Sequence, residues 1–386
     1  MRRRRTKWIV RMILYMVVCW FFCCSPVRAT SQMEEDSEIE EKILAQFDFT
    51  EIDMNLAELF PEEKLNFADT VSALIHGDLE PSKELFVQLV QDQISYEFRY
   101  NKNALAHILI ISVFAAIFSN FSGAFQNKQI SEISFYILYL LLLTICLNSF
   151  RLALEGVETH IQTLLEFMRI LAPTYFLAVA AACGTTSSLV FYNIVLLLIY
   201  LVELIVMNIL LPLVHIFIMV QVMNYLSKED YLSQFTDLIR KIIVWSLKTL
   251  LGCIIGLNLV QGILSPAIDT LQRSIVTRGA QSLPGIGNAI GGITDVVLGT
   301  VLVIKNSIGM AGAIVCAAIC AVPLLQMGTM ALLYKLAAAV VQPVSDKRIV
   351  GCIDSISEGA ELLLRVILTT AILFLITVAI VAASTS

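Results

Sequence analysis

The apolar positions of this chain form long, nearly uncharged runs rather than the single-face or alternating patterns of soluble domains. From Ala104 onward one such run follows another, with few charges between them. Nine segments are recognised: Ala104–Ser122, Ser131–Phe150, Phe167–Cys183, Leu189–Leu210, Pro212–Leu226, Ile242–Leu264, Leu283–Ile304, Ser307–Val341 and Glu361–Ala383. A helix needs about 20 residues to cross the hydrocarbon core. The pattern therefore predicts an all-α, polytopic integral membrane protein.

Two stretches, Leu189–Leu226 and Ser307–Val341, are too long for one straight span. Each carries a proline, Pro212 and Pro323 respectively. Because proline lacks an amide donor, we expect it to break or kink each helix. Broken backbone persists inside a membrane only where protein or a watery cavity satisfies the freed groups.

The two broken segments are followed by similar sequence. A polar loop comes next in each case, Ser227–Lys241 and Gln342–Glu358, and then one clean span. Paired interrupted segments are typical of transporters built from internal repeats, so we regard this as a weak repeat.

Basic loops orient the predicted segments. If an exported N-terminal region places Ala104 outside, five crossings bring Arg240 and Lys241 inside, as the positive-inside rule requires. Lys347 and Arg348 must also lie on the cytoplasmic side. Two topologies satisfy this condition, one with eight membrane segments and one with ten. Both place the C-terminus outside.

The N-terminal 29 residues have the order of a secretory signal peptide. Residues 1–29 hold seven Lys/Arg and no acid, and the 13-residue apolar run Met12–Cys24 is followed by Val27-Arg28-Ala29. A basic start, a short apolar core and a small-residue cleavage pattern predict a signal peptide, with the mature chain beginning near Thr30. An uncleaved signal anchor is the alternative.

Charge divides the remaining chain into two parts. Residues 30–100 hold 4 Lys/Arg and 18 Asp/Glu, a net charge of −14, whereas residues 101–386 hold 15 Lys/Arg and 14 Asp/Glu. We therefore expect a signal peptide at 1–29, a small acidic extracytoplasmic helical module at 30–103 and a polytopic helical membrane domain at 104–386. The module contains no cysteine, so it has no disulfide framework.

Composition argues against a soluble enzyme and a nucleic-acid binder. The chain has 386 residues, 58% of them apolar and 15% charged, whereas soluble domains are near 45–50% apolar and 25% charged. The hydrolase, zincin, Walker and Cys-x-x-Cys motifs are absent. Cys316 and Cys320 have no further ligands nearby, so we interpret them as packing residues, and no metal or cofactor is expected.

Small residues at helical spacing suggest close helix packing. Gly252-x-x-x-Gly256, the run from Gly285 to Gly292 and Ala313, Ala317 and Ala321 follow this spacing. Such residues let helix backbones approach one another in lipid. A second interpretation of the glycine run, which precedes Thr294 and Asp295, is a re-entrant pore lining.

Glu203 is the strongest single candidate for a functional residue. It lies well inside an otherwise apolar span, where an acid costs about 2.5–3.5 kcal/mol near the centre. Such a group faces a pathway or coupling site, or is protonated and hydrogen-bonded to a polar neighbour such as Asn208. Lys305-Asn306 and Lys335 also interrupt apolar sequence, and Lys335 has a stem long enough to snorkel.

Three stretches of the C-terminal third resemble the stage III sporulation protein AE family. They are Gly291-Gly-Ile-Thr-Asp295-Val-Val-Leu-Gly299, Ile304-Lys305-Asn306-Ser-Ile-Gly309-Met-Ala-Gly312, and the stretch from Leu333 to Ile349 that contains Lys335 and Gln342-Pro343-Val-Ser-Asp346-Lys347-Arg348. The exported leader, acidic module and polytopic remainder are similar to that family's layout.

The resemblance implies a function in an endospore-forming bacterium. It implies a multi-pass protein of the mother-cell membrane that faces the forespore and forms a channel, or feeding tube, with other stage III A proteins and a forespore membrane partner. The family offers no catalytic residues to transfer, so we expect no enzyme. A stand-alone secondary transporter, suggested by the broken segments and Glu203, is the alternative. An intramembrane protease is disfavoured because the spans lack paired aspartates or a Ser-His pair.

Overall fold

A computed structural model describes the helical part of the chain. It covers residues 47, 49–59, 67–75, 106–110, 113–114, 128–183, 185–226, 231–280 and 287–383. Phe47–Ser386 forms one compact unit, and the unit before it, Met1–Gln46, lies outside the described residues. The predicted signal peptide, most of the acidic module and most of the first apolar segment also lie outside them and stay predictions.

The described elements are helices, and no strand occurs in the ranges just given, which confirms the all-α prediction. Two short helices are followed by six long helical elements and one π-helical turn: α3 Thr50–Leu59, α4 Phe67–Ile75, α6 Lys128–Cys183, α7 Thr185–Leu201, η2 Val202–Leu210, α8 Leu211–Leu226, α9 Ser233–Ala280, α10 Gly287–Val341 and α11 Lys347–Ala383. At 1.5 Å per residue, the 56 residues of α6 extend for about 84 Å.

Helix α6 joins two segments that the sequence analysis separated. Ser131–Phe150 and Phe167–Cys183 belong to one continuous helix. The charged stretch between them stays helical because Val157, Ile161 and Leu164 recur at helical spacing and are buried.

The two prolines do not break their helices, so the predicted breaks are wrong, whereas the predicted kinks stay a prediction. Helix α10 continues through Pro323. Around Pro212 the chain stays helical from Thr185 to Leu226 but becomes a π-helix in η2, directly before the proline. The Leu211 amide donates to the Val206 carbonyl, five residues back. This wider turn accommodates the proline ring, which would otherwise press on the preceding turn.

Both predicted polar loops are too long. Helix α9 begins at Ser233, and α11 begins at Lys347, which leaves only residues 342–346 of the second loop. The start of α11 is helical because Ile349, Ile353 and Ile356 are fully buried along one face. Tertiary burial therefore extends the helix into sequence that looks polar.

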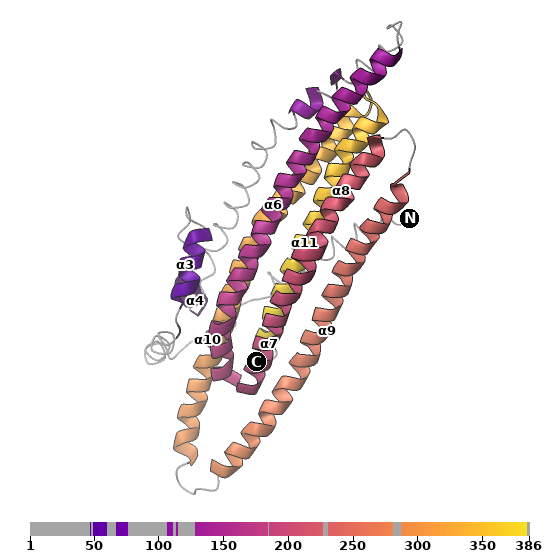
Figure 1. The fold of residues 1–386 in the computed structure, drawn as a ribbon. Coiled ribbons are helices and arrows are strands. Elements are labelled where there is room, and N and C mark those ends of the chain that lie inside the picture. The colour runs from indigo at the N-terminus through magenta and orange to yellow at the C-terminus, as the bar shows by residue number, and fades with distance from the viewer. Residues whose placement is uncertain are drawn as a thin grey trace. The chain divides into compact units, whose positions relative to one another are not determined.

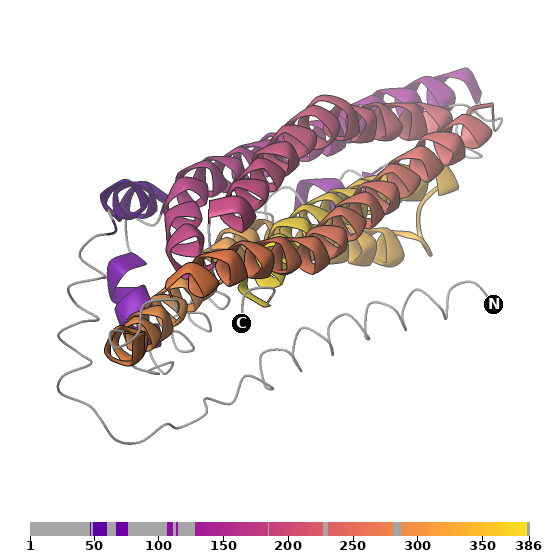
Figure 2. The same cartoon turned by 90° about the horizontal axis from the view of Figure 1, so that it is seen from below.

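The long helices pack side by side. Helix α10 lies against α6 and α11, and α8 lies against α11 (Figure 1). Helix α9 lies at the edge of this group in Figure 1, next to α8, and it also contacts α7 and α11; in Figure 2 it runs across the group in front of α11.

Glycines allow close contacts between α10 and α6. A Cβ on Gly309 would lie 2.6 Å from the Tyr175 hydroxyl, and one on Gly312 would lie 2.6 Å from Leu171, so α10 and α6 touch there. Gly252 and Gly256 face open space on α9. Among the described residues, nothing packs against these two glycines, because the side of α9 that carries them is turned outward.

Four helical stretches among the described residues are long and apolar enough to cross a membrane: Phe135–Ala182, Ser188–Leu226, Gly299–Val341 and Lys347–Ile380. They hold 34 to 48 residues each, whereas about 20 suffice. The predicted total of eight to ten segments stays a prediction. Because these helices exceed the thickness of the hydrocarbon, part of each must contact water, headgroups or other protein.

Candidate functional site

Glu203 lies in the first turn of the π-helix and pairs with Arg169 of α6. The Arg169 Nη2 atom donates to Glu203 Oε2 across 2.6 Å, and each side chain is 50% exposed. The structure thus gives Glu203 a charged partner 34 residues upstream, in place of the neutral neighbour Asn208 that we considered.

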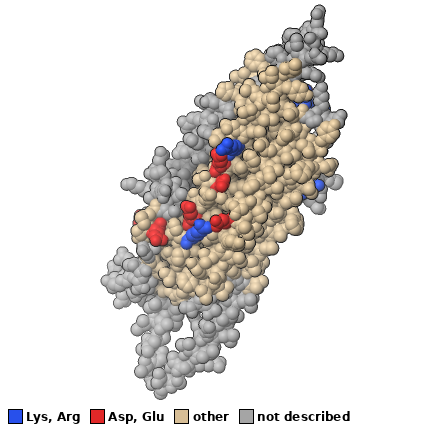
Figure 3. All heavy atoms as spheres, viewed as in Figure 1, with Lys and Arg blue, Asp and Glu red and all other residues tan. Residues whose placement is uncertain are grey.

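Arg169 belongs to a charged outer face in the middle of α6. Exposed polar side chains recur there at intervals of three or four residues: Arg151, Glu155, Glu158, Gln162, Glu166 and Arg169. Arg151 Nε donates to Glu155 Oε1 across 2.7 Å, and these side chains are 69% and 51% exposed. Figure 3 shows acidic and basic side chains gathered over the middle of α6, with uncharged surface toward both ends.

The two ends of the same helix face are apolar. Before the charged face, Ile137, Leu140 and Leu141 are exposed, and after it Leu177 is exposed. Exposed charges between exposed apolar bands are characteristic of a surface whose middle contacts water or another protein.

Lys305 is fully buried near the C-terminal end of α11. Its Nζ atom lies 3.5 Å from the carbonyl oxygen of Ala382. The last carbonyls of a helix have no partner within the helix and form the negative end of its dipole, which favours a cation. The position of Lys305 is therefore explained by α11. The next residue, Asn306, has a buried Oδ1 atom that accepts no hydrogen bond from the described residues.

Lys335 does not simply snorkel. Its ammonium group pairs with the Asp354 carboxylate and so connects α10 to α11. Both side chains remain partly exposed, at 49% and 33%.

Asp346 caps the start of α11. Its Oδ1 atom accepts the Arg348 backbone amide at 2.9 Å and the Arg348 Nε–H at 3.3 Å. The Arg348 guanidinium also lies 3.9 Å from the centre of the Phe135 ring on α6. Partial burial acts to raise the pKa of Asp346, but the hydrogen bonds and charge of Arg348 outweigh it and hold this pKa below its ordinary value.

Comparison with known proteins identifies the family. The model of the family described as "Stage III sporulation protein AE" matches residues 65–385. This chain belongs to the stage III sporulation protein AE family.

A curated relative agrees with this assignment. The chain is 25% identical over 325 residues to stage III sporulation protein AE of Bacillus subtilis (strain 168), covering 84% of this chain and 80% of the relative. No solved structure matches. The family membership supports a role in sporulation, and the four apolar helices indicate a membrane protein. The family's name describes no catalytic activity.

In this stage III sporulation protein AE family member, the described candidate residues do not come together in one site. Those with a described partner each belong to a different contact between or within helices. Glu203 and Lys335 pair with Arg169 and Asp354, which we did not single out, whereas Asp346 pairs with Arg348 of its own sequence motif. Asp295 lies in α10, but its side chain is outside the described part of the structure. Among the described residues, no group of three His, Cys, Asp or Glu side chains could hold a metal ion.

Three helices of this family member meet at a polar junction that the sequence pattern does not predict. Glu358 of α11 accepts hydrogen bonds from Gln221 Nε2 of α8 at 3.0 Å and from Arg240 Nη1 of α9 at 3.2 Å. The sequence pattern predicts Glu358 at the end of the loop Gln342–Glu358, where an exposed carboxylate is common and does not indicate a specific contact. The helical spacing of the buried Ile349, Ile353 and Ile356 is the signal that would have placed it on a helix.

Proposed function

We propose that this chain is a membrane subunit of a sporulation-specific channel that links the mother cell and the forespore. The observation that carries the proposal is the charged outer face of α6, residues 151–169, which lies between apolar bands. The family membership supplies the sporulation setting.

A face with these exposed charges is unsuited to lipid. Each charge near the centre of a bilayer costs about 2.5–3.5 kcal/mol on insertion scales, and α6 exposes Arg151, Glu155, Glu158, Glu166 and Arg169. An aqueous path removes that cost, and several subunits together can enclose such a path. Opposite charges along the face suit a conduit for hydrated solutes rather than a site selective for one sign of charge.

The proposal extends to partners and location. We place the protein in the mother-cell membrane facing the forespore, with other stage III A proteins and a forespore membrane partner. The module at 30–103 lies outside the cytoplasm after an exported leader at 1–29. Its net charge of −14 over residues 30–100 would steer a basic partner surface at distances of about 8 Å. We expect deletion of residues 34–60 to weaken these contacts while membrane insertion persists.

Cysteine accessibility tests the aqueous path. In a background without the nine native cysteines, Gln162→Cys places a thiol in the middle of the charged face, and Leu177→Cys places one on the apolar band of the same helix. In sporulating cells, a small water-soluble thiol reagent should modify position 162 and spare position 177, which a lipid-soluble reagent should reach. Protection of position 162 from the water-soluble reagent would contradict the proposal.

A stand-alone secondary transporter is the second candidate. It is favoured by the π-helical turn before Pro212 and by the Arg169–Glu203 pair beside it, because π turns are frequent at functional sites. Purified protein in liposomes distinguishes the two. Solute uptake without partners favours the transporter, whereas a channel subunit should be inactive alone and should migrate in mild detergent with other stage III A proteins.

A further inference from the structure

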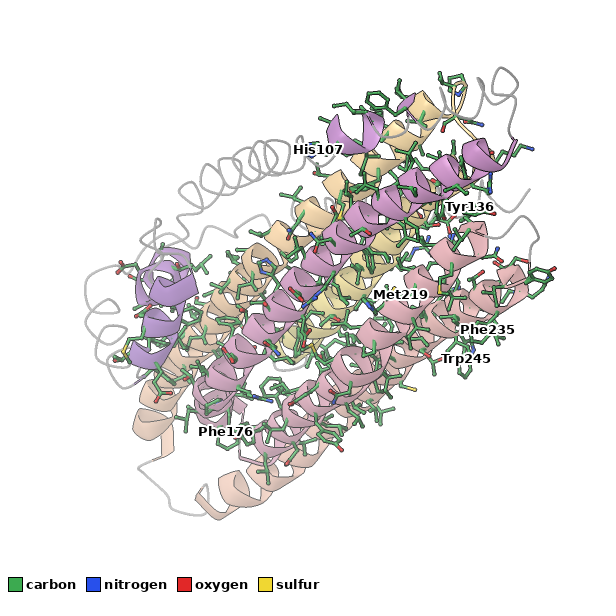
Figure 4. The ribbon with its side chains drawn as sticks, turned by 45° about the horizontal axis from the view of Figure 1, so that its top comes forward. His107, Tyr136, Phe176, Met219, Phe235 and Trp245 are labelled. Atoms are coloured by element: carbon green, nitrogen blue, oxygen red, sulfur yellow. The ribbon has the colours of Figure 1, made fainter. Side chains whose placement is uncertain are left out.

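Helix α9 has two apolar faces, and only one of them packs against the other described helices. The inward face is buried and includes Ile239, Ile243, Leu247, Leu250 and Ile254. The outward face exposes four large side chains: Phe235 at 49%, Leu238 at 52%, Ile242 at 44% and Trp245 at 69%. Figure 4 shows Phe235 and Trp245 on the outer side of the helix.

Two lysines border this outward face. Lys241 and Lys248 are exposed, lie two turns apart, and form no ion pair with any of the described residues. Asp237 is exposed on the same edge one turn earlier, so these three side chains carry a net charge of +1. Arg240 does not contribute, because it turns inward to Glu358.

The polarity of the outward face changes after Lys248. From Thr249 to Val260, the exposed positions whose side chains are described carry no charge, and Leu257, Leu259 and Val260 are 45–57% exposed. Tryptophan favours the boundary between headgroups and hydrocarbon, and lysine favours the headgroup side of that boundary. Along the outward face, exposed charged side chains therefore accompany the apolar ones from Asp237 to Lys248, and the described exposed positions beyond Lys248 are uncharged.

We propose that the outward face of α9 is a lipid-binding surface at one membrane boundary, where Lys241 and Lys248 bind the headgroups of anionic phospholipids and Trp245 lies at the edge of the hydrocarbon. This surface is independent of the charged face of α6, so the proposal holds whether or not the chain lines a channel.

Lipid fits this face better than a packed protein helix. Gly252 and Gly256 would allow a helix to approach, but such a helix would also cover Trp245 and desolvate two lysines that lack acidic partners among the described residues. Anionic headgroups supply the missing charge while the lysines stay hydrated. A nearby Lys or Arg gains about 1 kcal/mol from an anionic membrane surface, which corresponds to about a fivefold preference.

Trp245 is a natural reporter, because the other two tryptophans, Trp8 and Trp20, lie in the predicted leader. The full chain with Trp8→Phe and Trp20→Phe is reconstituted in phosphatidylcholine vesicles with bromine either near the headgroup or near the end of the acyl chain. Bromine near the headgroup should quench Trp245 at least about twofold more strongly. Equally weak quenching by both lipids would show that protein covers this face and would overturn the proposal.

Headgroup preference tests the lysines. In mixed vesicles, bromine is carried by phosphatidylglycerol in one series and by phosphatidylcholine in the other, which gives the relative affinity of the two lipids at Trp245. We expect phosphatidylglycerol to be favoured, and the preference to fall about fivefold for each lysine changed to Gln.

Control variants separate charge from folding. Lys241→Arg with Lys248→Arg should retain the preference, and Arg151→Gln, which removes an exposed cation from α6, should leave it unchanged. If the double Gln variant keeps the parent's preference, or if Arg151→Gln lowers it equally, the headgroup proposal is wrong.

Discussion

Arg169 and Glu203 lie 2.6 Å apart although 34 residues separate them, and their contact ties the middle of α6 to the first turn of the π-helix η2. Each side chain is 50% exposed, so water or headgroups can screen the pair. Exposed ion pairs typically contribute about 0–1 kcal/mol to the free energy of unfolding. We therefore expect this contact to matter more for function than for folding.

Glu203→Gln is predicted to accumulate normally and to lose conduit activity. Glutamine keeps the size of the side chain and a hydrogen-bonding oxygen but removes the charge that faces Arg169. Protein abundance in sporulating membranes and the yield of heat-resistant spores measure the two effects. Normal sporulation with this variant would leave Glu203 a structural role only.

Exchanging the two charges is the matched control. If the ion pair itself is required, Arg169→Glu combined with Glu203→Arg should recover more activity than either single change. If the carboxylate at position 203 acts on a passing solute, the exchanged protein should stay inactive.

Glu358→Ala is predicted to lower the free energy of unfolding by roughly 1–3 kcal/mol, because two hydrogen-bond donors lose a partly buried acceptor. Glu358 receives Gln221 from α8 and Arg240 from α9, so α9 should loosen first. Thermal unfolding in detergent and proteolysis within α9 measure this. Glu361→Ala, which removes only an exposed contact to Arg365 in the next turn, should have a much smaller effect.

Gly359→Ala is predicted to destabilise the packing of α11 by about 1–3 kcal/mol. Its Cβ would lie 2.6 Å from the Phe150 ring and would also collide with Ile218, and both of these side chains are buried. Gly252→Ala is the opposite case, because its Cβ meets nothing and alanine favours a helix by up to about 1 kcal/mol. Unfolding temperatures that moved in the same direction for both variants would contradict the packing of α11 described above.

Stability should depend on Asp346 at acidic pH. The pKa of this carboxyl is lower in the folded protein than its ordinary value of 3.8, so its contribution is fully present above that value and is lost as the pH falls through the lowered pKa. Asp346→Ala should cost about 1 kcal/mol near neutral pH through loss of the cap.

The difference in unfolding temperature between the parent and Asp346→Ala should therefore narrow as the pH falls through the lowered pKa, below 3.8. Asp346→Asn should keep most of the cap but lack this pH dependence. A difference that stays constant with pH would show that the ionised carboxylate is unimportant.

The C-terminus is predicted to lie on the same, non-cytoplasmic side as the acidic module, because both topology solutions require it. In a cysteine-free background, Ser384→Cys should react with an impermeant reagent on intact cells, and a cysteine at Lys347 should be protected. Protection at position 384 would show that the predicted number of crossings is wrong by one.

Some of the structure followed from the sequence because its cause is local. Long apolar runs at helical period predicted membrane helices, and the four candidate spans agree. Charges inside such runs, at Glu203, Lys305 and Lys335, were recognised because an isolated charge is costly wherever the helix packs.

The continuity of the helices and the partners of the charged residues could not be predicted without the tertiary structure. Residues 151–166 and 347–358 are helical because they are buried against neighbouring helices. The presence of Pro212 in the sequence did not by itself predict the π-helix before it. The partners of Lys335, Glu203 and Glu358 lie 19 to 137 residues away in sequence. The packing of long helices brings residues that are distant in sequence to the same height along the bundle. The periodicity of one helix shows which face a residue lies on, but it does not show which residue of a neighbouring helix lies beside it.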